Sequence, residues 1–111
     1  MPEIRTLAID LAKKSFQVCA TTREGVVIFN RSFTRKTLEK LLVGSPRCRI
    51  AMEACATSHY WGRLAQSCGH DVRLIPPIYV KPFVKQQKND ANDAAAITTA
   101  VRQPDMRFVE V

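Results

Sequence analysis

Residues 4–10, "IRTLAID", form a short apolar segment that ends in a carboxylate, Asp10. Two similar segments follow at residues 15–20 and 26–31, and polar or glycine-containing breaks separate all three. Short apolar and β-branched segments with such breaks predict three strands, joined as two hairpins. Gly25, at the end of the connection "TTREG", is the residue type that a tight turn between two strands usually needs.

From Thr34 onward the hydrophobic period changes to that of a helix, with leucines at positions 38, 41 and 42. Thr34 can cap the start of this helix, and Gly44 stands where a C-terminal cap belongs. The rest of the chain predicts a strand at 47–54, a helix at 57–69 that starts with a hydroxyl cap, a strand at 70–75, an irregular or short helical connector to residue 87, a helix from Asp90 to about Arg102, and a sixth strand at 106–111.

This order of elements predicts an α/β fold built on a mixed sheet. Three antiparallel strands come first, and strands that alternate with helices follow them. Strands separated by helices pair in parallel, and their connecting helices cover the faces of the sheet. The 111 residues suffice for one domain with its own core, so we expect a single domain over residues 1–111, with helices on both faces of the sheet.

The charge of the chain favours a polyanionic partner. Seventeen lysines and arginines against ten acids leave a formal net charge of +7. The four cysteines are spaced too unevenly for a zinc ribbon or finger, so we expect reduced, buried thiols. No segment resembles a signal peptide or is apolar enough to span a bilayer, and these absences predict a soluble, cytoplasmic protein without a membrane partner.

Two acids stand at the ends of predicted strands. Asp10 ends the first strand, and Glu53 ends the fourth. If the first strand is central and the fourth is its parallel neighbour, both carboxylates lie at one edge of the sheet. Acids are disfavoured in apolar strands, and two close carboxylates repel unless one is protonated or a cation lies between them. A hard divalent ion such as Mg²⁺ meets that requirement with oxygen ligands.

Asp90 and Asp93 open the last predicted helix, in "KNDANDAAAI" at residues 88–97. As a plain helix start, Asp90 is the N-cap and Asp93 the third helical residue, both favoured by the helix dipole. A spacing of three also places both side chains on one helical face, where they can add ligands to a site beside Asp10 and Glu53. The two interpretations are compatible. Four convergent acids can hold a pair of divalent ions, which suits cleavage of a phosphodiester.

Basic residues precede this aspartate pair in a segment that also contains aromatic side chains. Such a segment suits phosphate contact and base stacking, and it equally suits a solvated loop with its aromatic residues turned inward. The candidate nucleic-acid contacts are Arg73, Lys81, Lys85 and Lys88, with the aromatic residues Tyr79 and Phe83 among them.

Four segments together resemble a known family: "AIDLAKKSFQV", "AMEACATSHYW", "GHDVRLIPPIYVKPFVKQQKNDANDAAAI" and "MRFVEV". They are similar to the N-terminal domain of the DEDD transposases of bacterial insertion sequences, relatives of the Piv DNA invertase. The resemblance implies a RuvC-like, ribonuclease H-like fold. It also implies that Asp10, Glu53, Asp90 and Asp93 bind Mg²⁺ or Mn²⁺, as two ions, for cleavage and strand exchange of DNA.

The chain departs from this family at two points. Ala56 stands where the family usually has a glycine after "MEAC". Family members also continue into a second domain with a nucleophilic serine, so we expect a fragment that does not transpose DNA alone. For the full-length protein the resemblance implies DNA as substrate, a guide RNA as a possible partner, and a homo-oligomer.

Two other functions compete with this interpretation. A nucleotide-binding half of the actin or sugar-kinase type also opens with a strand carrying an aspartate, but it needs glycine-rich phosphate loops, and "IDLAKKS" has none. A nucleic-acid-binding module without catalysis stays open, with the acids serving only as helix caps and strand ends.

Overall fold

A computed structural model of the protein describes residues 3–12, 15–84 and 89–111. The strands of these residues are β1 Thr6–Leu11, β2 Phe16–Thr21, β3 Val27–Phe33, β4 Arg49–Glu53 and β5 Asp71–Ile75. The helices are α1 Arg35–Gly44, α2 Ser58–Ser67, α3 Pro77–Val80, the 3₁₀ turn η1 Lys81–Phe83, and α4 Asp90–Val101. The predicted order of elements is confirmed, except for the sixth strand.

The five strands form one mixed sheet in the order β3-β2-β1-β4-β5. β1 is central: it pairs antiparallel with β2 and parallel with β4, with Ala8 opposite Cys19 on one side and Ala51 on the other. β5 continues the parallel half beside β4. The mixed sheet and the central place of β1 were both predicted, and this architecture is a ribonuclease H-like α/β fold.

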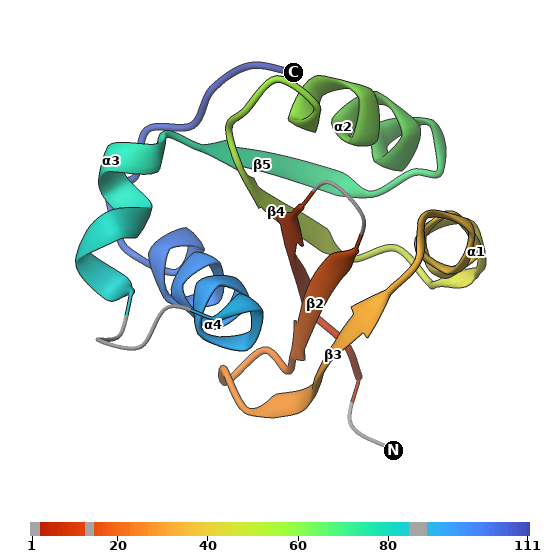
Figure 1. The fold of residues 1–111 in the computed structure, drawn as a ribbon, viewed down its shortest axis with the longest axis horizontal. Helices are drawn as coiled ribbons and strands as arrows, with labels where there is room; N and C mark the ends of the chain where they lie inside the picture. Colours follow the sequence, from red (N-terminus) through yellow and green to blue (C-terminus); the bar gives the residue numbers. More distant parts are fainter. Residues whose placement is uncertain (1–2, 13–14, 85–88) are drawn as a thin grey trace.

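Side chains alternate between the two faces of the sheet, and each face has its own core. Leu7 and Ile9 of β1 face the larger core, which α1 and α2 cover. Ala8 of β1 faces the second core, beneath α4 and α3 on the other side of the sheet (Figure 1). Small side chains make up much of this second core, from the sheet and from α4: Ala8, Cys19, Ala51, Ala94, Ala96 and Ala100. Small residues on both surfaces let α4 pack close to the sheet, and this closeness matters for the acids described below.

The helix ends follow local chemistry that the sequence predicted in part. Thr34 caps α1 in a capping box with Thr37, as expected. Gly44, expected as the C-terminal cap, is instead the last helical residue, and Ser45 is the C-cap with extended backbone. Thr57 is the N-cap of α2, as predicted, but its hydroxyl makes no capping bond. The Ser58 hydroxyl accepts from the amide of Cys55 and donates to its carbonyl, in the turn before the helix.

Residues 106–111 do not form the predicted sixth strand. Their only described pairing is an antiparallel bridge of Val109 with Leu74, in which the Val109 amide donates to the Leu74 carbonyl at 2.7 Å. Asp105, just upstream, has a left-handed backbone with φ of 60°. The segment thus touches β5 at one position after this turn and does not extend the sheet.

The cysteines are unpaired thiols, and the expected burial holds for two of them. Cys19 and Cys48 are buried, whereas Cys55 is exposed because it lies in the turn before α2 and not inside a strand. The ring of buried His70 accepts from the Cys48 amide through Nδ1 and contacts the Leu42 carbonyl through Nε2 at 2.7 Å, so Nε2 carries the proton.

Among the residues that the structure describes, no helix is both long and apolar enough for a membrane span.

Candidate metal centre

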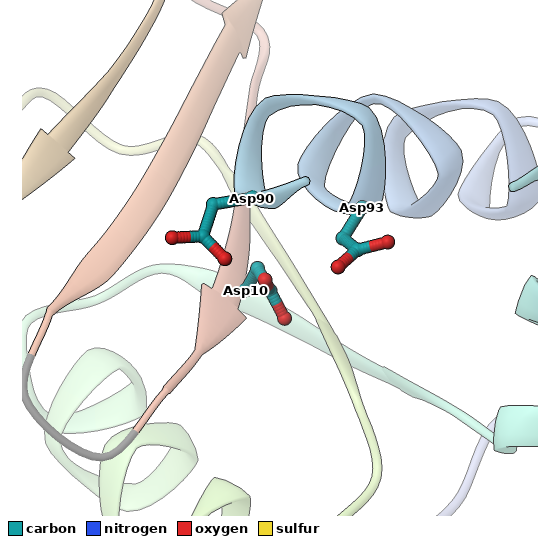
Figure 2. Close-up of side chains that lie close together, drawn as sticks. All are labelled: Asp10, Asp90 and Asp93. Carbon is teal, nitrogen blue, oxygen red and sulfur yellow. The ribbon is translucent and has the colours of Figure 1, made fainter. Parts of the chain in front are cut away.

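Three aspartates converge where β1 ends and α4 begins. Asp10 stands one residue before the end of β1, on the face that α4 covers, because it follows Ala8 by two positions. Asp90 and Asp93 lie in the first turn of α4. Figure 2 shows the three side chains gathered between the helix start and the strand. One carboxylate oxygen from each lies within 4.8 Å of the others.

The start of α4 is capped by Asn89 and not by Asp90. The side-chain oxygen of Asn89 accepts from the backbone amide of Asn92 at 2.9 Å. The backbone carbonyl of Asn89 accepts from the backbone amide of Asp93 at 3.0 Å. Asp90 is therefore the first helical residue and Asp93 the fourth, which corrects the predicted N-cap and third position. Because Asn89 supplies the cap, the two carboxylates are not needed for it. They still gain from the helix dipole at this end.

Two polar residues of the antiparallel strands hold the helix start in place. Asn30 of β3 donates from its side-chain amide to the carbonyl of Ala91 at 2.9 Å, and it accepts from Gln17 of β2 at 2.8 Å. This chain of bonds ties the sheet to the first turn of α4, between Asp90 and Asp93. Sequence reasoning missed both residues. Polar amides within otherwise apolar strands were the available signal.

The acids act on one another electrostatically. The pKa of Asp10 is raised from 3.8 to about 6, first by its burial and then by the negative charges of Asp93, Asp90 and Glu53. A raised carboxyl pKa means that the negatively charged form of Asp10 is less stable in the folded protein than in water. A bound cation relieves both the desolvation and the repulsion.

Glu53 lies near this group but outside its closest part. The parallel register pairs Ile9 with Met52, so the next residues along each strand, Asp10 and Glu53, stand at the same level of the sheet. Its charge reaches Asp10, as the pKa of that residue shows. Among the described residues, however, the group of acids within 4.8 Å of one another holds the three aspartates and not Glu53. The predicted meeting of all four acids stays a prediction.

The predicted nucleic-acid contacts have different surroundings. Arg73 pairs with Asp71 at 3.0 Å and stacks over the Phe108 ring, whereas Lys81 is exposed in η1. Lys85 and Lys88 lie outside the described residues. Phe83 packs against the second core, and Tyr79 is 43% exposed, so the two aromatic residues divide between the inward and outward roles considered for them.

The fold and this site together define a class: a ribonuclease H-like domain with an acid cluster beside its central strand. Comparison with known proteins gives the family. A family model described as transposase, of the DEDD transposases of the IS110 group, matches residues 7–111, and the chain belongs to this family.

Curated relatives agree with this assignment. A probable family 20 transposase of Pseudomonas aeruginosa is 45% identical over 95% of this chain and 31% of its own length. The transposase for insertion sequence element IS1328 of Yersinia enterocolitica is 41% identical over 98% of this chain and 33% of its own. The transposase for insertion sequence element IS1111A of Coxiella burnetii is 40% identical over 99% and 30%. The chain thus spans about a third of the length of these relatives.

Proposed function

We propose that this domain supplies metal-dependent cleavage and strand exchange of DNA in transposition, with Asp10, Glu53, Asp90 and Asp93 as metal ligands. The observation that carries the proposal is the meeting of three carboxylates from two distant parts of the sequence, with the pKa of Asp10 raised to about 6. Structural ion-pair networks raise no carboxyl pKa in this way, because they place a cation beside the acid.

The donor set fits a hard divalent cation. All the candidate ligands are carboxylate oxygens, which suit Mg²⁺ and Mn²⁺, and no thiol or imidazole belongs to the group of three. When bound, a pair of such ions clamps the attacking and leaving oxygens of an in-line phosphoryl displacement. Glu53 lies outside the group of three and is the further carboxylate proposed for a second ion.

The chain's own residues hold this geometry in different ways. Asp10 is fixed by the central strand, which has neighbours on both sides. Asp90 and Asp93 are carried by a capped helix that Asn30 ties to the sheet. Sites built on such elements keep their ligands in place more accurately than sites built on loops. Arg73, Lys81, Lys85 and Lys88 are proposed to hold the DNA backbone beside the acids.

The whole protein's properties follow from the family resemblance and are proposals too. We propose that the intact transposase acts in the cytoplasm as a homo-oligomer, with a guide RNA as partner, and that residues 1–111 form one catalytic domain within it.

A nicking assay tests the proposed chemistry. Supercoiled plasmid is incubated with the chain and Mg²⁺ or Mn²⁺, and open circles are counted. Wild-type protein is expected to nick, and Asp10→Asn to nick at least about 100-fold more slowly, since one ligand oxygen becomes a neutral amide. Asp105→Asn is the matched control, because Asp105 is exposed and an asparagine tolerates its left-handed backbone.

The outcome separates the two candidate functions. Nicking that continues in EDTA, or that Asp10→Asn leaves unchanged, would contradict the proposed metal centre. Plasmid binding that never leads to cleavage, with no effect of metal, would instead support a nucleic-acid-binding module without catalysis.

A further inference from the structure

A second charged surface lies at the end of the sheet opposite to the acids. Three adjoining hollows, of about 470, 260 and 250 Å³, open there, and Arg5 lines all of them. The arginines around these hollows come from five separate segments: Arg5 before β1, Arg23 in the β2–β3 turn, Arg47 before β4, Arg49 in β4, and Arg102 after α4. We call this set the arginine end. It holds half of the arginines of the chain, and no lysine of the described residues lines these hollows.

The arginine end is too far from the metal centre to share its substrate atoms. Arg5 and Asp10 stand at opposite ends of β1, about 16 Å apart at roughly 3.3 Å per residue. Arg102 and Asp90 stand at opposite ends of α4, about 18 Å apart at roughly 1.5 Å per residue. Two independent elements thus give the same separation. The arginines form a surface of their own.

Local contacts build one side of this surface. The Arg102 guanidinium donates to the carbonyls of Arg23 at 3.1 Å and Glu24 at 3.4 Å. It lies so close to Gly25 that a Cβ on this glycine would be 2.8 Å from it. The turn between β2 and β3 therefore has room for the arginine because position 25 has no side chain.

The acids nearby do not neutralise the surface. Asp71 lies between Arg49, at 3.7 Å, and Arg73, at 3.0 Å, so its charge is already balanced. Glu3 and Glu24 line the hollow of about 470 Å³, and neither forms an ion pair within the described residues. Within the described part of the chain, Arg5, Arg23 and Arg47 are exposed and make no ion pair. Three guanidinium groups are left to meet an external anion.

We infer that the arginine end binds the phosphodiester backbone of a nucleic acid, at a place separate from the metal centre. Guanidinium groups form paired hydrogen bonds with phosphate oxygens, a geometry that lysine does not offer. Arginines from five segments around three hollows are too dispersed for one small anion, and they suit a row of phosphates. Two of the partners proposed above have such a backbone, the DNA substrate and the guide RNA.

The test replaces the three unpaired arginines. Arg5→Gln, Arg23→Gln and Arg47→Gln are combined in the 111-residue chain. Binding of a labelled DNA duplex and of an RNA stem-loop is followed by fluorescence anisotropy in EDTA over a series of salt concentrations. We expect the affinity for at least one of them to fall 10-fold or more near 0.1 M salt. The slope of log K against the logarithm of the salt concentration should become shallower by about two to three, since three phosphate contacts are lost.

A matched control removes the same charge elsewhere. Lys36→Gln, Lys40→Gln and Arg63→Gln change exposed residues of α1 and α2, and we expect less than a threefold loss of affinity. Arg5→Lys, Arg23→Lys and Arg47→Lys together keep the three charges without the paired hydrogen bonds, so we expect this variant to bind more weakly than the wild type and more tightly than the glutamine variant. A far-ultraviolet circular dichroism spectrum of the glutamine variant that matches the wild type excludes misfolding as the cause. An effect on the duplex alone identifies DNA as the bound polymer, and an effect on the stem-loop alone identifies RNA.

Three results would overturn the inference: no binding by the wild type, no loss in the glutamine variant, or an equal loss in the control. Because the assay contains EDTA, it is independent of the proposed metal centre. The glutamine variant should also bind Mn²⁺ like the wild type.

Discussion

Asp10 is the residue on which the proposed chemistry depends, because it is the member of the acid group that the central strand holds and partly buries. The sequence predicted this residue from a broken rule, an acid at the end of an apolar strand. Asp90 and Asp93 could be predicted as partners from their helical spacing. That Asn89, and not Asp90, caps the helix could not be predicted, because adjacent Asn and Asp residues cap equally well and only the backbone angles choose between them.

The raised pKa of Asp10 makes the stability of the metal-free chain depend on pH. The pKa is about 6 in the folded state against 3.8 ordinarily, so the unfolded chain loses this proton first as the pH rises. The free energy of unfolding is therefore highest, as far as Asp10 is concerned, below about pH 4, and it falls as the pH rises from about 4 to 6. The loss should be about 1 kcal/mol after allowance for the partial exposure of the group.

Asp10→Asn should remove this dependence. In urea unfolding with EDTA, the variant is expected to gain about 1 kcal/mol over the wild type at pH 7, and nothing at pH 3.5. If the difference in unfolding free energy between the two proteins is the same at pH 3.5 and pH 7, ionised Asp10 does not destabilise the fold.

At the scale of elements, the start of α4 decides whether the acids meet. The sequence predicted this helix and its faces well, because its alanine-rich period is strong. It could not predict the tie from Asn30 to Ala91, since 61 positions separate the two residues and only the sheet brings them together. The failed strand at 106–111 has a similar cause: its pattern suits a strand, but its approach to β5 allows one bridge.

Loss of the tie should loosen the helix start. Asn30→Ala removes the bond to the Ala91 carbonyl and is expected to cost about 1 kcal/mol of stability. We also expect Mn²⁺ affinity to fall several-fold, because two ligands lose their fixed position. Ser32→Ala, on the same strand, serves as the control. Equal Mn²⁺ affinity in both variants, measured by electron paramagnetic resonance, would rule out a positioning role for Asn30.

The cap at Asn89 gives a separate prediction for the same helix. Asn89→Ala should destabilise the chain by about 1 kcal/mol in urea unfolding, and Asn89→Asp should be close to neutral, because aspartate caps as well as asparagine. If alanine were tolerated without loss, the bond from the Asn92 amide would contribute nothing to the fold.

At the scale of the whole molecule, charge is divided between the two ends of the sheet. The net charge of +7 predicted a polyanionic partner but not where it binds. The arginine end could not be predicted because its residues are spread from position 5 to position 102, and only the fold gathers them. The acids could be predicted because strand ends and helix starts are visible in a sequence.

Metal binding should stabilise the whole chain. A ligand that binds only the folded state at 100 times its Kd adds about 2.7 kcal/mol, which raises Tm by roughly 10 °C in a domain of this size. Thermal unfolding with Mn²⁺ and with EDTA measures the difference, and Asp10→Asn should show little of it. An equal rise in both proteins would place the ion elsewhere.

The most direct test of the metal centre is the Mn²⁺ affinity of three proteins: wild type, Asp10→Asn and the control Asp105→Asn, each measured with and without duplex DNA. We predict that Asp10→Asn binds at least about 10-fold more weakly than the wild type and that Asp105→Asn binds equally well. Equal affinity of the wild type and Asp10→Asn, or no binding by the wild type even with DNA present, would contradict the account.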